Sequence, residues 1–399
     1  MAQQQNATQK LNDLLAQVKA LDISSWCPSE RAEAQKSLND ALTDAETPYE
    51  HLLRLSGSHL HLALLRLGAD ISLFKTLAAG GQPLTTNLLG EKLGISPDLL
   101  GRVLRFLASV GSVKQTAEDT FAPGKIAHAM ASEGLDSGVH LLFDIHDRTY
   151  QALPDAVAEL GYSYVDDIRN GVFQKAFGTE LSCYEYLVHN PELQGHMQDA
   201  MKLQPPDGDW LAALPVGDAV AKSESDDPER VLFVDIGGGM GHQCLRLRER
   251  YPDAPGRVIV QDMPITIGRI PKPMPHGVEA MAHSFDDPQP IKGAKLYYLR
   301  NVLHGLPDDH SVSVLKNIAS AMNAESRLVI DDLVVPDEGA CRQACQLDFI
   351  MMASIAGRKR TRAQWYRLLE AAGFKILDIH TYTWPLQDSL IIASPVRLG

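Results

Sequence analysis

The sequence predicts an α/β protein in which a Rossmann-like domain with a parallel sheet follows a mainly α-helical N-terminal part. Two observations lead to this prediction. From residue 231 onward, apolar runs of strand length alternate with helical patterns, as in parallel strands joined by crossover helices. Before residue 208, apolar residues recur instead at helical spacing. The predicted strands are 231–234, 257–261, 278–281, 295–299, 327–331, 375–380 and 389–394.

Length and composition indicate a soluble protein with more than one domain. The 399 residues are 45% hydrophobic, and no apolar run reaches the roughly twenty residues needed to cross a bilayer. The N-terminus, MAQQQNATQK, lacks the apolar segment of a secretory signal. Five cysteines, an odd number, favour reduced thiols and a cytoplasmic location, and none completes a metal site. The net charge of −13 disfavours nucleic acid as a partner, so we expect a small molecule.

The N-terminus is predicted to form two apolar helices. Residues 8–21 place leucines and a valine on one helical face. A polar connection is expected up to Pro48, after which Tyr49–Leu67 forms a long apolar helix. A helix such as 8–21, isolated at a terminus, needs a partner surface in this chain or in another subunit.

The next segment predicts a winged-helix arrangement. It consists of two capped helices separated by Gly94, and then a small hairpin, at 88–93, 99–110, 112–115 and 120–122. DNA binding is the familiar use of this arrangement. The second helix carries only Arg102 and Arg105 as basic residues in a strongly acidic chain, so DNA binding is not expected.

Residues 138–203 are predicted to be helical, with a mixture of aromatic and polar side chains that suits a substrate wall or an interdomain core. The candidates for a pocket are Phe143, His146, Tyr150, Phe173, Phe177, Tyr184, Met197, Met201 and Met351; we take His146, Phe177, Met201 and Met351 as substrate-binding. Pro205 to Gly208 interrupt the helical pattern. The predicted domains are therefore 1–137, a connecting segment 138–207, and 208–399.

A glycine-rich turn follows the first strand of the α/β domain. Glycines at positions such as Gly237 and Gly239 allow a tight turn and the close approach of a ligand. The third glycine of a dinucleotide fingerprint is out of place. Asp262, at the end of the next strand, can bind the two hydroxyls of a ribose. The pattern therefore favours a ligand with one nucleoside over NAD.

Several polar residues fall at or just after the ends of predicted strands: Asp235, Asp262, Ser284, Arg300, His304 and Asp332. Ligands bind at the carboxyl ends of parallel strands, because these ends meet at one edge of the sheet. We therefore expect a single site.

Five motifs in this order resemble those of class I S-adenosylmethionine-dependent O-methyltransferases, of the plant caffeate and isoflavone type and their fungal relatives in secondary metabolism: VDIGGGMGH, VQDMP, LYYLRNVLHGLPDD, LVIDDLVVP and GRKRTRAQWYRLLEAAGF. The resemblance extends from about Leu52 to the C-terminus. It implies S-adenosylmethionine (SAM) as cofactor, a phenolic or polyketide-type acceptor, and a homodimer built through the winged-helix domain.

The resemblance also implies roles for individual residues. His304 takes the position of the general base, and Asp332 that of the acid which orients it. A histidine suits proton removal near neutral pH because its usual pKa is about 6.5. The implied cofactor contacts are Asp235, Gly237, Gly239, Asp262, Met263, Ser284, Phe285 and Arg300.

Three residues depart from the family pattern. Gly305 stands where an acid usually follows the base, and Ser284 stands where an acid usually contacts the adenine amine. Lys359 stands where many relatives have a glutamate, which makes it a third catalytic candidate. A cation beside His304 would lower the pKa of that histidine. The sequence leaves open whether Lys359 faces the site or the solvent.

These departures leave alternatives open. A fungal offshoot of this fold binds SAM without transferring its methyl group and catalyses dehydration or pericyclic ring formation by donating hydrogen bonds to a carbonyl. Arg300, His304 and Lys359 would supply such donors. A catalytically silent binding or regulatory protein is a third possibility, although the acidic charge and the nearly complete site argue against it.

Overall fold

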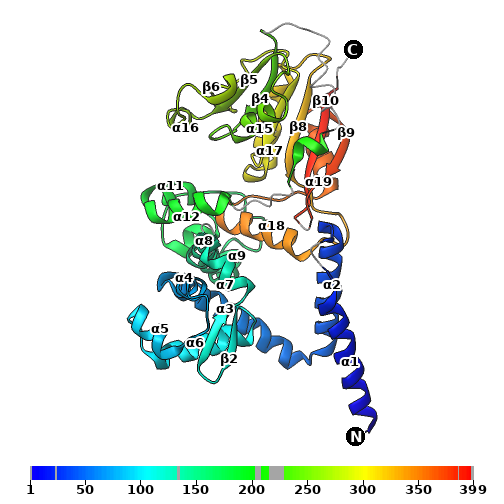
Figure 1. Cartoon of the computed structure of the whole chain (residues 1–399). Coiled ribbons are helices and arrows are strands. Elements are labelled where there is room, and N and C mark those ends of the chain that lie inside the picture. The colour runs from blue at the N-terminus through cyan, green and yellow to red at the C-terminus, as the bar shows by residue number, and fades with distance from the viewer. Residues whose placement is uncertain are drawn as a thin grey trace.

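The computed structural model describes residues 2–22, 25–132, 135–202, 208–214, 229–384 and 386–396. Its α/β part contains a seven-stranded sheet of order β6-β5-β4-β7-β8-β10-β9 (Figure 1). The strands are β4 (Val231–Ile236), β5 (Arg257–Asp262), β6 (Glu279–Ala282), β7 (Leu296–Arg300), β8 (Arg327–Leu333), β9 (Phe374–Thr381) and β10 (Asp388–Pro395). All seven predicted strands are present.

The sheet is parallel only from β6 to β8. Strand β10 runs antiparallel to both of its neighbours, β8 and β9, so the expectation of a parallel sheet is wrong at this edge. The connection between β9 and β10, residues 382–387, is short. A parallel crossover needs a dozen or more residues, whereas an antiparallel turn needs only a few.

Helices cover both faces of the sheet. One hydrophobic core lies between the sheet and helices α17 (Asp308–Ala319) and α19 (Arg362–Ala371). A second core includes residues of α13 (Trp210–Ala213) and α15 (His242–Arg250). Strand β4 is buried along its whole length. Burial on both faces explains why the strands read as continuous apolar runs in the sequence.

The N-terminal elements form a separate tier below the sheet in Figure 1. They are α3 (Pro48–Asp70), α4 (Leu73–Ala79), β1 (Leu84–Thr85), α5 (Thr86–Leu93), α6 (Pro97–Ser109), β2 (Val113–Ala117), β3 (Thr120–Pro123) and α7 (Lys125–Ala131). The three strands pair in the order β1-β3-β2. The two predicted helices and the hairpin that follows them are all present.

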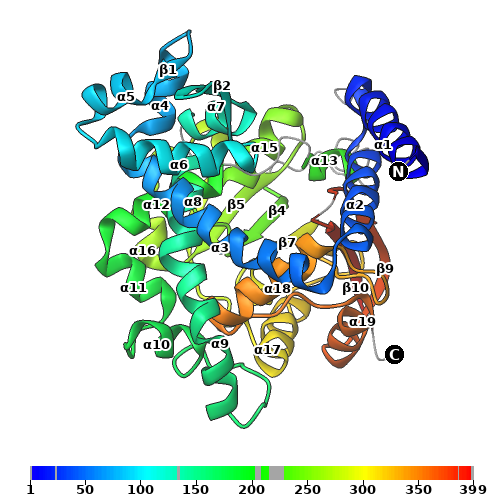
Figure 2. The same ribbon diagram turned by 90° about the horizontal axis from the view of Figure 1, so that it is seen from below.

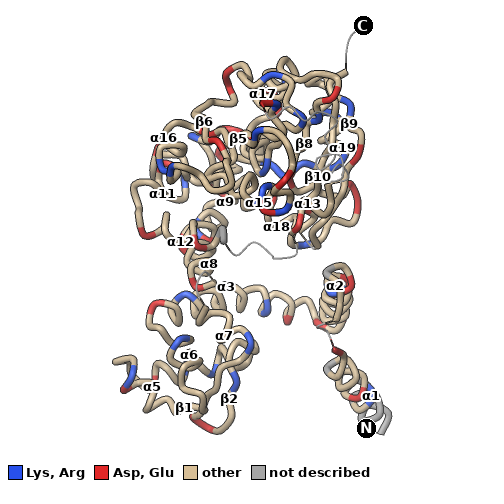
Figure 3. The backbone as a smooth tube through the Cα atoms, turned by 45° about the horizontal axis from the view of Figure 1, so that its top comes forward, with Lys and Arg blue, Asp and Glu red and all other residues tan. Residues whose placement is uncertain are grey.

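Two further helices precede this tier: α1 (Ala2–Ala20) and α2 (Pro28–Ala45). The polar connection predicted in place of α2 is wrong. This helix has little apolar periodicity, and local signals start it instead: Pro28 at the first turn and the Glu30 carboxylate accepting a bond from the Cys27 N–H. Figures 1, 2 and 3 show α1 and α2 to one side of the rest of the chain, with α3 leading from them to the N-terminal tier.

A middle tier of helices lies between the N-terminal tier and the sheet (Figure 1). It contains α8 (Leu135–Leu141), the π-helix η2 (Leu142–Asp147), α9 (Arg148–Glu159), α10 (Val172–Phe177), α11 (Cys183–His189), α12 (Pro191–Lys202) and α18 (Arg342–Ile355). Helix α18 comes from the C-terminal part of the chain but packs against α9, α10 and η2. In the described part of the chain, no helix has the length and apolar character needed to span a membrane.

Candidate active site

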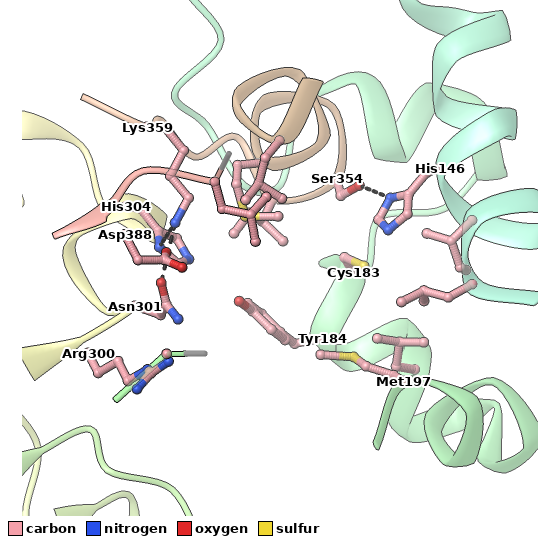
Figure 4. Close-up of a pocket in the computed structure, with 18 of the residues that line it drawn as sticks. His146, Cys183, Tyr184, Met197, Arg300, Asn301, His304, Ser354, Lys359 and Asp388 are labelled. Carbon is pink, nitrogen blue, oxygen red and sulfur yellow. Dashed lines mark hydrogen bonds between the residues drawn. The ribbon is translucent and has the colours of Figure 1, made fainter. Parts of the chain in front are cut away.

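Three side chains meet at the carboxyl edge of the sheet, facing the middle tier: His304, Asp332 and Lys359, of which Figure 4 labels His304 and Lys359. His304 lies in the short 3-10 turn η4 (Leu303–Gly305) after β7, and Asp332 lies near the end of β8. Lys359 comes from the segment between α18 and α19. Its Nζ is 2.7 Å from Asp332 Oδ1 and 2.7 Å from His304 Nδ1, and that Nδ1 is 3.3 Å from Asp332 Oδ1. Lys359 therefore faces the site.

Burial and charge decide the protonation of this cluster. Burial alone would raise the pKa of Asp332, but Lys359 and His304 together hold it below its usual value. Burial lowers the pKa of His304, and Lys359 lowers it further, while Asp332 opposes both effects. At neutral pH, Asp332 is therefore a carboxylate and His304 a neutral imidazole.

The motif GRKRT holds the turn that carries His304. The Arg358 N–H donates to the carbonyl oxygen of His304 at 2.7 Å. The buried guanidinium of Arg360 donates to the carbonyl oxygens of Leu303 and Leu306, at 2.6 and 2.9 Å. At Gly357, a Cβ would lie only 2.5 Å from the His304 carbonyl oxygen, so this close approach requires glycine. These contacts fix the position of His304 relative to Lys359.

A cavity of about 330 Å³ opens beside this cluster. Figure 4 shows its polar end, with Arg300, Asn301, His304, Lys359 and Asp388. The remaining wall is mostly apolar and comes from the middle tier; it includes Leu141, Ile145, Cys183, Leu187, Met197, Leu347, Met351 and Ile355. The cavity therefore suits a molecule with one polar end and an apolar body.

Of the four predicted substrate residues, the structure places two in the cavity wall and one outside it. His146 and Met351 line the cavity, and His146 Nδ1 lies 2.9 Å from Ser354 Oγ. Burial lowers the pKa of His146 to about 4, so this histidine is neutral. Phe177 does not line the cavity: its ring stacks on Phe173 at 4.5 Å, in a hydrophobic core. The side chain of Met201 lies outside the described residues.

Among the cavity residues that the sequence did not predict, Asn301 and Asp388 lie at the polar end (Figure 4). Asn301 directly follows Arg300 at the end of β7, and that position was the signal that could have found it. Asp388 is the first residue of the last strand, β10. It reaches the site because β10 is antiparallel, so its first residues lie at the same edge as the last residues of β8, with Asp388 opposite Leu333. The position of Asp388 at this edge can be predicted only when the direction of β10 is known.

The predicted cofactor residues follow the same edge of the sheet, along β4, β5 and β6. The carboxylate of Asp262 accepts bonds from the N–H groups of Gly239 and Met263, at 2.9 and 2.8 Å. Gly237 and Gly239 both have positive φ, and no atom lies within 4 Å of a Cβ built at Gly239. The turn is therefore held by Asp262 and open to the approach of a ligand at Gly239, whereas a Cβ at Gly237 would lie 2.9 Å from Val302.

Other residues complete this edge. Asp235 is fully buried, one of its carboxylate oxygens has no hydrogen-bond partner, and burial raises its pKa to about 7. The segment with Ser284 and Phe285 follows β6, and the His283 N–H binds the carbonyl oxygen of Asp262. Arg300 pairs with Asp331 at 3.3 Å and also lines the cavity, so it lies between the two halves of the site.

An open glycine turn, an acid at the end of β5 and an unpaired buried carboxylate oxygen fit a nucleoside ligand with cationic groups, as SAM is. Among the described residues, no group of three or more His, Cys, Asp or Glu side chains is placed to hold a metal ion.

Comparison with known proteins decides the family. The family model for the O-methyltransferase domain matches residues 150–375. The chain belongs to the O-methyltransferase family. Over 362 residues it is 63% identical to O-methyltransferase dpfgI of Gibberella zeae, covering 91% of this chain and 95% of that protein. It is 38% identical to demethylsterigmatocystin 6-O-methyltransferase of Aspergillus parasiticus, covering 88% of this chain and 89% of the relative.

Among solved structures, this O-methyltransferase family member resembles LepI in complex with SAM. The TM-score is 0.85 and the identity 36%, covering 99% of each chain. A structure described as a pericyclic reaction enzyme gives a TM-score of 0.87 at 35% identity, covering 97% of this chain and all of that one. The family is one of SAM-dependent enzymes, and its fold accounts for the α/β sheet and the helices around it.

Proposed function

We propose that this enzyme transfers the methyl group of SAM to a hydroxyl oxygen of a phenolic or polyketide-type small molecule in secondary metabolism. One observation carries the proposal: the buried cluster of His304, Asp332 and Lys359 lies at the polar end of a largely apolar cavity, on the sheet edge that also bears the open glycine turn. Family membership supports the same reaction.

The residues present fit SAM, which supplies an electrophilic methyl group when bound. Asp262 would hold the ribose hydroxyls, the turn at Gly237 and Gly239 would allow close approach of the backbone, and Asp235 would face a positive group. Met263, Ser284, Phe285 and Arg300 would complete the contacts. The apolar cavity wall would exclude water and orient the acceptor, and His304 would contact its oxygen.

Transfer of an isotopically labelled methyl group tests the proposal. The protein is incubated with methyl-labelled SAM and a panel of phenolic and polyketide acceptors, and the products are analysed by mass spectrometry. We expect a product that is heavier by one labelled methyl group. Retention of all label in SAM across the panel, with SAM binding intact, would contradict methyl transfer.

A second candidate function has its own support. Arg300 and His304 both line the cavity, so the site carries N–H groups that can activate a carbonyl. One similar structure is described as a pericyclic reaction enzyme. A SAM-binding pericyclase or dehydratase would give a rearranged or dehydrated product while SAM is not consumed, and the same incubation detects this outcome.

The proposed organisation is a winged-helix domain at 1–137, connecting helices at 138–207 that line the pocket, and a cofactor-binding domain at 208–399.

Dimerisation is part of this proposal. Large apolar side chains are exposed along α1, α2 and α3: Leu14, Leu15, Val18, Leu38, Leu42, Leu52, Leu53, Leu55 and Leu60. A monomer seldom exposes so many large apolar side chains on consecutive helices, whereas a second copy would cover them.

Light scattering at micromolar concentration is therefore expected to give the mass of a homodimer. The double substitution Leu52→Glu with Leu55→Glu puts two charges one helical turn apart on α3 and should shift the protein toward the monomer. Leu377→Glu is the matched control, because Leu377 is similarly exposed but lies on β9. A monomeric wild-type protein with full activity would rule out the dimer.

A further inference from the structure

The ammonium group of Lys359 has three acceptors: Asp332 Oδ1 at 2.7 Å, His304 Nδ1 at 2.7 Å and Asn301 Oδ1 at 3.3 Å. An ammonium has three N–H donors and no acceptor. The side chains of Lys359 and Asp332 are 3% and 1% exposed, so this charged pair is shielded from water. The bond to His304 can therefore run in one direction only, from Lys359 to a lone pair on Nδ1.

This bond decides which nitrogen of His304 carries the proton. Because Nδ1 accepts from Lys359, a neutral His304 has its proton on Nε2. In the usual general-base arrangement, a carboxylate accepts the Nδ1 proton and leaves the Nε2 lone pair for the substrate. Here Asp332 Oδ1 lies 3.3 Å from Nδ1, farther than Lys359. A proton on Nδ1 would also point at an ammonium group.

We infer that Lys359 is a positioning residue that holds His304 as a hydrogen-bond donor toward the cavity, and that the acceptor molecule reaches the site already ionised. This inference rests on the proposed methyl transfer. It replaces the general-base role of His304 that the sequence predicts. The acceptor would be an acidic enol, an acidic phenol or a carboxylic acid.

The charges around His304 agree with the donor role. Lys359 and Arg360 both oppose a second proton on the ring, burial opposes it further, and only Asp332 favours it. His304 is therefore a poor acceptor for the proton of a neutral hydroxyl group. As a donor, its Nε2–H would hold the oxygen anion in place.

Methyl transfer to such an acceptor balances without a base. The anionic oxygen forms its bond to the methyl carbon with its own electron pair. The bond from that carbon to the cofactor sulfur breaks, and its electron pair stays on sulfur. No proton is released at the site, because the acceptor lost its proton in solution. The apolar wall, with residues such as Leu141, Ile145 and Met351, indicates that the acidic oxygen lies at one end of an apolar skeleton.

Nitrogen-15 NMR of histidine-labelled protein tests the donor assignment directly. The His304 signals are identified by their loss in His304→Gln, and the chemical shifts of the two ring nitrogens show which one carries the proton. We expect the Nε2–H form in the wild-type protein and the Nδ1–H form in Lys359→Met, where Asp332 becomes the partner of Nδ1. Lys375→Met removes an exposed lysine from β9 and should leave the wild-type form unchanged. An Nδ1–H form in the wild-type protein would overturn the inference.

The rates with acceptors of graded acidity test the substrate class. At pH 7, the wild-type rate should fall by up to about ten-fold for each unit by which the acceptor pKa exceeds 7, because the ionised fraction falls ten-fold per unit and the greater nucleophilicity of the more basic anion offsets only part of this fall. In Lys359→Met, the free Nε2 lone pair should weaken this dependence, and weakly acidic phenols should gain at least about ten-fold relative to acidic ones. A wild-type rate independent of acceptor pKa would overturn the substrate class. If no acceptor is methylated, the proposed function fails, whereas the NMR result still decides the proton position.

Discussion

Replacement of His304 by alanine is expected to lower turnover by about a hundred-fold or more, while the affinity for SAM stays nearly unchanged. His304 lines the polar end of the cavity and belongs to the buried cluster with Lys359 and Asp332. Its loss removes the group that would hold the reacting oxygen, whether as a base or as a hydrogen-bond donor. Steady-state kinetics gives the turnover, and calorimetry gives the SAM affinity.

Two variants control this experiment. His128→Ala removes an exposed histidine from α7 and should leave turnover unchanged. His304→Gln keeps an N–H donor but no basic nitrogen, so it should recover part of the lost turnover if His304 acts as a donor. Turnover within a few-fold of the wild-type value in His304→Ala would show that this residue does not take part in the reaction.

Replacement of Asp262 by alanine is expected to weaken SAM binding at least about ten-fold, because charge-assisted hydrogen bonds contribute roughly 1.5–3 kcal/mol. The structure adds a second reason for this loss. The Asp262 carboxylate accepts bonds from the N–H groups of Gly239 and Met263 and so holds the glycine turn. Its loss would therefore remove the proposed ribose contact and also loosen the turn. Isothermal titration calorimetry measures the effect.

Asp253→Ala is the matched control for Asp262, since it removes an exposed carboxylate from the same domain. Asp262→Asn separates the two contributions, because an amide oxygen can still accept from the turn but carries no charge. Thermal unfolding without SAM shows how far the loosened turn affects stability. Unchanged SAM affinity in Asp262→Ala would remove this residue from the cofactor site.

Much of the fold could be predicted from local pattern. Strands buried on both faces are apolar over most of their length, so β4, β5, β7, β8 and β10 could be located by their composition, whereas the edge strands β6 and β9 are only partly buried. The direction of β10 and the helix α2 could not be predicted in this way. The first depends on how the chain returns to the sheet edge, and the second on a few residues that start a helix without an apolar face.

The sequence by itself determined which residues lie at the carboxyl edge of the sheet, because the carboxyl ends of parallel strands must meet there. Asp262, Arg300, His304 and Asp332 could be assigned to that edge for this reason. Only the tertiary structure decided the rest. Lys359 belongs to a segment between helices, and it faces His304 because its neighbours Arg358 and Arg360 bind the turn that carries this histidine. Phe177 packs against a hydrophobic core that also supplies cavity residues, without lining the cavity itself, and Asp388 reaches the cavity through an antiparallel strand. The direction of a side chain outside the helices and strands depends on contacts with residues that are distant in the sequence, and the spacing of residues does not predict these contacts.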